Sequence, residues 1–137
     1  MDPGEKKILR EHNIAAYSMY HVDKYGIGKV VEMALDRINP KRDRPVSSNI
    51  YLIWLKIHLS FDVDALDPSF APSTGTPVRG GLTYREGCYI CESLYETGCL
   101  VAVDMMEVNP TLERDLALET VRVATALVRC ALGESLL

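Results

Sequence analysis

Long apolar stretches are missing from this chain, and so is any concentration of positive charge. The longest apolar run covers only residues 50–55, which is far too short for a helix that crosses a bilayer. Residues 1–7 have no apolar core and are not poor in acid, so they resemble neither a secretory signal nor a transit peptide. With 15 basic residues against 19 acidic ones and no basic stripe, nucleic-acid binding has little support.

The four cysteines do not form the pattern of a disulfide-rich domain. Cys88 and Cys91 make a Cys-x-x-Cys pair, but no second pair or nearby histidine completes a zinc site. No strand directly precedes this pair in the manner of a thioredoxin motif, and Cys99 and Cys130 are isolated. We interpret the cysteines as reduced thiols of an intracellular protein, with buried packing favoured over a metal or redox role.

The remaining composition is that of an ordinary globular domain. The chain has 137 residues, 47% of them hydrophobic and 25% charged, and a net charge of -4, so it can form one compact core. Helical spacing and β-rich runs alternate along the sequence, which predicts an α/β fold with a parallel sheet flanked by helices. The expected helices cover residues 4–12, a segment that ends near residue 38, 83–97 and 112–132, and the expected strands cover 14–20, 57–63 and 100–106.

Acidic residues follow two of the expected strands. Asp62 and Asp64 end the first of these strands, and their spacing predicts that both side chains point to one face. Glu107 ends the next strand, and a Pro-, Gly-, Ser- and Thr-rich loop covers residues 65–83. Because open α/β sheets bind ligands at the carboxyl ends of their strands, this pattern favours a site for a hard cation with a loop around it.

Each of these residues also has a simpler interpretation. An isolated Asp-x-Asp is more often a solvated strand end or a helix cap than a metal site, and an isolated Glu107 is more often a surface acid. His58 is expected to pack in the core, and Asp104 to serve the strand structurally. Asp67, which precedes a proline, is expected to form a turn rather than to be a third ligand.

Several segments resemble the arginases, within the ureohydrolase family of binuclear manganese enzymes. The loop continuation LTYREG resembles arginases more than the related agmatinases. The resemblance implies that this chain is part of a three-layer arginase-like fold, and that the family reaction hydrolyses L-arginine to L-ornithine and urea. The matching segments are residues 2–5, 25–30, 60–68 (SFDVDALDP), 74–77 (TGTP), 80–87 (GGLTYREG) and 104–110 (DMMEVNP).

The resemblance also implies a role for individual residues. Asp62 and Asp64 match two ligands of the family's manganese pair, and Glu107 matches the glutamate that pairs with the substrate guanidinium. Carboxylates suit both tasks chemically. Thr76 matches a threonine that lines the pocket near this glutamate. Arg85 lies where arginases make subunit contacts, so the expected assembly is a homotrimer.

The sequence departs from the family pattern in two ways. It lacks the upstream metal-binding histidine, the Asp-x-His-x-Asp cluster and the proton-relay histidine, so we expect a single partial domain over residues 1–137 that corresponds to the C-terminal portion of an arginase. Residues 46–56 form an atypical insert. The compartment stays open between cytoplasm and mitochondrion, and two alternatives remain: an agmatinase or other guanidino hydrolase, and a non-catalytic fragment that associates with full-length arginase.

Overall fold

The computed structural model describes residues 3–38, 56–112 and 115–135, which form two compact units. The first unit covers residues 1–49 and the second residues 50–137. The insert expected at residues 46–56 falls almost entirely outside the described residues. No helix in the described ranges is long and apolar enough to cross a membrane.

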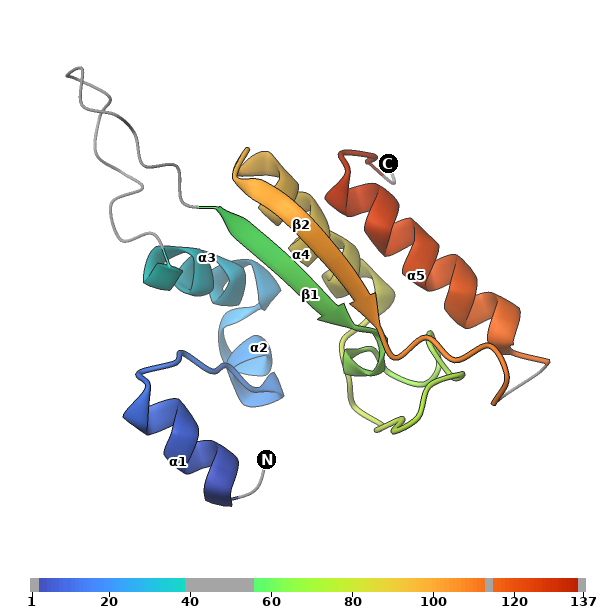
Figure 1. Cartoon of the computed structure of the whole chain (residues 1–137), viewed down its shortest axis with the longest axis horizontal. Helices are drawn as coiled ribbons and strands as arrows, with labels where there is room; N and C mark the ends of the chain where they lie inside the picture. The colour runs from blue at the N-terminus through green and yellow to red at the C-terminus, as the bar shows by residue number, and fades with distance from the viewer. Residues whose placement is uncertain (1–2, 39–55, 113–114, 136–137) are drawn as a thin grey trace. The chain divides into compact units, whose positions relative to one another are not determined.

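The first unit is helical throughout its regular structure (Figure 1). Its helices are α1 (Pro3–Glu11), α2 (Met19–Tyr25) and α3 (Ile27–Ile38), and α3 buries Val30, Val31 and Leu35. The helices expected over residues 4–12 and ending near residue 38 are thereby confirmed.

The strand expected over residues 14–20 is wrong. The backbone N–H of Ser18 donates to His21 Nδ1 at 3.0 Å, and the His21 N–H donates to the Ser18 carbonyl at 2.8 Å. Because these local contacts cap a helix, α2 begins at Met19 and includes His21.

The second unit contains two parallel strands joined by a helical crossover. Strand β1 (Ile57–Asp62) pairs with β2 (Leu100–Met106), and Ser60 lies opposite Asp104 in the register. Between them in sequence runs α4 (Tyr84–Glu96), and α5 (Ala117–Ala131) follows β2. This arrangement confirms the expected parallel sheet with helices and places the ends of β1 and β2 side by side (Figure 1).

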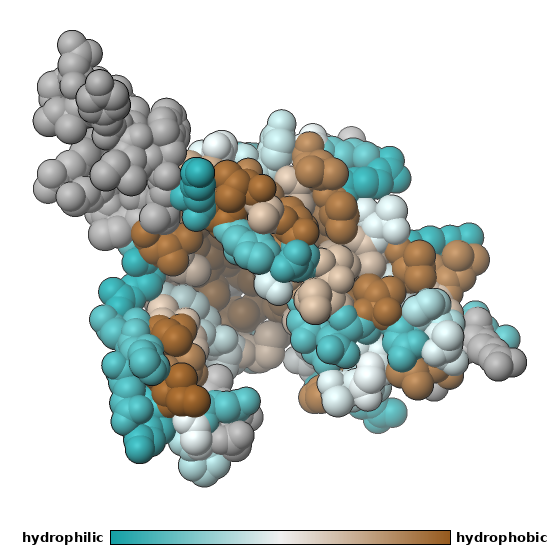
Figure 2. Space-filling view, in the orientation of Figure 1, coloured by the Kyte–Doolittle hydropathy of each residue, from teal (hydrophilic) through white to brown (hydrophobic). Residues whose placement is uncertain are grey.

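One hydrophobic core holds the second unit together. Phe61 of β1, Cys91 of α4 and Leu127 of α5 belong to the same buried cluster, against which Val103 of β2 packs. Both helices therefore cover the inner face of the sheet, whereas the opposite face mixes polar and apolar side chains, as Figure 2 shows. The core fixes where the strands end, and so where the acidic residues lie.

Helix boundaries in this unit follow local chemistry. The Thr83 N–H donates to Glu86 Oε2 at 2.7 Å and the Glu86 N–H donates to Thr83 Oγ1 at 3.3 Å, a capping box that begins the helix expected over residues 83–97. The final helix starts at Ala117 rather than near residue 112. The reason is a turn in which Asn109 Oδ1 accepts from the Thr111 N–H at 3.1 Å.

Candidate metal and substrate site

Asp62 and Asp64 lie at the carboxyl end of β1, but they do not alternate along a strand as the sequence suggested. The strand ends at Asp62, and Asp64 belongs to a short 3-10 helix, η1 (Val63–Ala65). The Asp64 N–H donates to Asp62 Oδ1 at 3.2 Å, so the first aspartate caps the turn that carries the second. Val63 and Leu66 are fully buried and anchor this turn in the core.

The long loop brings Thr76 to the same place. Thr76 Oγ1 donates to Asp64 Oδ2 at 2.5 Å, which fixes the orientation of that carboxylate. Glu107 arrives from the end of β2, where its Oε2 lies 3.5 Å from the point that a Cβ at Gly75 would occupy. The structure therefore brings together all four residues to which the resemblance gives a metal or substrate role: Asp62, Asp64, Thr76 and Glu107.

The electrostatics of this group favour a cation. Desolvation raises the pKa of Asp62, and the carboxylates of Asp64 and Glu107 raise it further, against the opposing effect of the Asp64 N–H bond. Carboxylates that repel one another at a strand end are stabilised when a positive ion neutralises them.

The donor set matches manganese in type but is small. Carboxylate oxygens suit this ion, and Asp62 and Asp64 are the residues that would hold it. Within the described ranges, however, no group of three or more histidine, cysteine, aspartate or glutamate residues is placed to hold a metal. The described part of the chain thus offers two adjacent carboxylates, but not a complete set of metal ligands.

Asp67 closes the loop that carries Thr76. Its carboxylate accepts from Ser69 Oγ at 2.7 Å, from the Ser69 N–H at 2.9 Å and from the Gly80 N–H at 2.8 Å. A parallel bridge between Leu66 and Leu82 joins the two ends of the same loop. The expected turn role of Asp67 is confirmed, and its three bonds leave it directed into the loop.

We expect this closure to weaken in acid. The bonds from Ser69 and Gly80 lower the pKa of Asp67 from 3.8 to about 2. A carboxyl group with a lowered pKa stabilises the fold fully above its unfolded value of about 4, and this contribution is lost as the pH falls through about 2. Urea unfolding midpoints from pH 5 to pH 2 should therefore fall more for the wild-type chain than for Asp67→Asn. An equal fall of the urea midpoint between pH 5 and pH 2 in the two chains would contradict this role of Asp67.

The structure corrects the expectation for His58. His58 Nε2 lies 2.8 Å from Asp104 Oδ2 on the neighbouring strand, and the two side chains are 54% and 52% exposed. His58 lies on the outward face because the inward positions of β1 belong to Leu59 and Phe61. Asp104 serves as its cross-strand partner in the middle of β2 rather than at the strand end.

The cysteines are free thiols and three of them are buried. Burial is the main reason that the pKa values of Cys91 and Cys130 rise to about 12, and it also raises the pKa of Cys88. Thiols that stay protonated are poor nucleophiles and poor metal ligands, which supports the packing interpretation. Arg85 is exposed near the start of α4.

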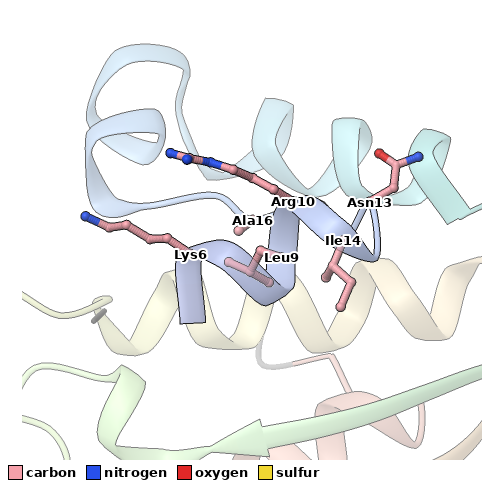
Figure 3. A pocket seen from close by; sticks show the side chains of 6 residues that line it. All are labelled: Lys6, Leu9, Arg10, Asn13, Ile14 and Ala16. Carbon is pink, nitrogen blue, oxygen red and sulfur yellow. The ribbon is translucent and has the colours of Figure 1, made fainter. Parts of the chain in front are cut away.

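A separate pocket lies in the first unit. It has a volume of about 460 Å³ and is lined by Lys6, Leu9, Arg10, Asn13, Ile14 and Ala16 (Figure 3). None of the predicted site residues contributes to it. No sequence pattern predicts this pocket, because its lining comes from one face of α1 and the irregular segment that follows.

These features define an α/β protein with a cluster of acidic residues at the carboxyl end of a parallel sheet. Comparison with known proteins identifies the family: the arginase family matches residues 1–133, and the chain belongs to it. Curated arginases from Glaciozyma antarctica and Neurospora crassa are 62% identical over 138 residues and 63% identical over 140 residues. The match covers 100% of this chain but only 37% and 36% of those proteins.

Solved structures agree with this assignment. The arginase from Bacillus subtilis has a TM-score of 0.81 at 37% identity, and the match covers 99% of this chain and 41% of that one. The cold-adapted arginase from Glaciozyma antarctica has a TM-score of 0.71 at 56% identity, over 99% and 40% of the two chains. The proclavaminate amidino hydrolase from Streptomyces clavuligerus reaches 0.68 at 26% identity, over 90% and 36%. The described fold is thus a portion of the arginase fold.

Proposed function

We propose that this chain carries part of the active site of an arginase, which hydrolyses L-arginine to L-ornithine and urea with manganese, as in arginine metabolism and the urea cycle. The observation that supports this most is the meeting of Asp62, Asp64, Thr76 and Glu107 where β1 and β2 end. Relatives of this chain at about 60% identity bear the name arginase, which agrees with the carboxylates found at these positions.

Each residue has a role in this proposal. Asp62 and Asp64 would hold manganese, and the ion would supply positive charge that favours attack of water on the guanidinium carbon. Thr76 holds the Asp64 carboxylate in one orientation through its hydrogen bond. Glu107 accepts N–H bonds from the planar guanidinium and so orients its carbon. We assign no proton-transfer residue, because the sequence lacks the histidine that has this role in the family.

We expect the isolated chain to be inactive and of low stability. Two aspartates are too few ligands to hold two divalent ions with useful affinity. The strands described are also only two, so each has an unpaired edge. Purified chain supplied with manganese should retain little metal after gel filtration and release no urea from arginine. Two bound ions per chain together with turnover would refute this expectation.

A chimera tests the function itself. The equivalent portion of the Glaciozyma antarctica arginase is replaced by this chain, so that the remaining ligands come from the relative. The chimera should release urea from arginine in the presence of manganese and lose this activity after chelation. A folded chimera that binds manganese but leaves arginine intact would contradict the proposed reaction.

Two other functions have specific support. The similarity to the proclavaminate amidino hydrolase is consistent with the alternative of an agmatinase or other guanidino hydrolase, and the chimera assayed with agmatine and arginine would discriminate. A chain that spans 37% of its relative could instead join trimers of a full-length arginase without catalysis, with the exposed Arg85 at the contact. Copurification with the intact enzyme, lost on Arg85→Glu, would favour that role.

A further inference from the structure

Three polar groups far apart in sequence meet beneath the candidate site. The Ser73 N–H donates to Thr120 Oγ1 at 2.9 Å, and Ser73 Oγ donates to the Asn109 carbonyl at 2.5 Å. The Asn109 N–H returns a bond of 3.1 Å to the Ser73 carbonyl. Ser73 and Thr120 are both fully buried, so water does not replace these bonds if a hydroxyl is removed. We call these three residues the Ser73 clamp.

The Ser73 clamp binds the backbone of Asn109, two residues after Glu107. Glu107 has a φ of 63°, in the left-handed region that residues with a side chain rarely adopt. Such a conformation persists only where the surrounding structure holds it. Ser73 bonds both the N–H and the carbonyl of Asn109. The Asn109 side chain in turn accepts from the Thr111 N–H at 3.1 Å and from the Thr111 hydroxyl at 2.7 Å.

We propose that Ser73 and Thr120 are positioning residues for Glu107. By fixing Asn109, the clamp keeps Glu107 in its left-handed conformation and its carboxylate against Gly75. Helix α5 thereby supports the substrate side of the site from behind, through Thr120. The inference rests on the proposed function in one respect: it is Glu107 that meets the guanidinium.

The test uses NMR on the whole 137-residue chain in a sulfate buffer, which strengthens apolar burial. A left-handed residue gives a strong intraresidue NOE between its amide and α protons. We expect this signal at Glu107 in the wild-type chain and its loss in Thr120→Val and Ser73→Ala. The Asn109 amide should exchange about tenfold faster in both variants.

Two matched variants separate positioning from general loosening. Thr120→Ser keeps the hydroxyl and should retain the NOE and the slow exchange. If Ser73→Ala does not fold, the comparison of Thr120→Val with Thr120→Ser tests the proposal by itself. Thr125→Val removes an exposed hydroxyl of α5 that donates only to Val121 O, and it should change neither signal. Absence of the NOE in the wild-type chain, its persistence in Thr120→Val, or an equal loss in Thr125→Val would overturn the proposal. Neither metal nor arginine is needed, so a failure of the proposed reaction would not affect this result.

Discussion

Glu107→Gln in the arginase chimera should lower kcat/KM for arginine about a hundredfold to a thousandfold, with manganese content unchanged. The carboxylate of Glu107 is the partner that we assign to the guanidinium, and removing one member of a hydrogen-bonded charge pair costs about 2–5 kcal/mol. Gln keeps the length and shape of the side chain but has only one accepting oxygen, so the pair with the planar fork is lost.

The control is Glu119→Gln, which removes an exposed carboxylate of α5 that lies 3.8 Å from Arg122. Exposed ion pairs of this kind contribute little, so kcat/KM should stay within about twofold of the unsubstituted chimera. Steady-state urea release and metal analysis on the same samples measure the effect. A Glu107→Gln chimera with full activity would show that the substrate is held elsewhere.

The elements that the sequence predicted well are those whose signals are local and agree with one another. Helix α4 combines a capping box with helical spacing, and β1 and β2 are apolar runs followed by acidic residues. The strand prediction for residues 14–20 was wrong because an apolar run without a partner strand is not stable. Instead, the contact between Ser18 and His21 caps a helix. In α5, the turn at Asn109 delays the helix although the helical spacing begins earlier.

The sequence and the resemblance predicted which residues belong to the candidate site, but not the contacts that hold them in place. The strand-end rule and the resemblance together pointed to Asp62, Asp64 and Glu107. That Asp64 lies in a 3-10 turn, and that Thr76 bonds it, depends on how the loop folds back. The contacts of Ser73 span 36 residues to Asn109 and 47 to Thr120, and single polar residues in a loop and a helix carry no periodic signal for such pairings.

The largest loss of stability is expected from Gly81→Ala. A Cβ at Gly81 would lie 2.6 Å from the Leu66 carbonyl carbon and 2.7 Å from both the Ala65 oxygen and the Asp67 nitrogen. These atoms belong to backbone that cannot move freely, because the Asp67 N–H donates to Leu82 O at 2.9 Å and the Leu82 N–H donates to Ala65 O at 2.8 Å. Relieving the clash must therefore open the base of the loop that carries Thr76.

We expect Gly81→Ala to lower the free energy of unfolding by about 3 kcal/mol, a large part of the stability of a marginally stable chain. Gly80→Ala is the matched control: no atom lies within 4 Å of its Cβ position, and only its φ of 83° is unfavourable, so it should cost about 1 kcal/mol. Thermal and urea unfolding followed by circular dichroism measure both. Equal losses would mean that backbone conformation alone, and not close packing of Gly81 against the turn after β1, sets the need for glycine here.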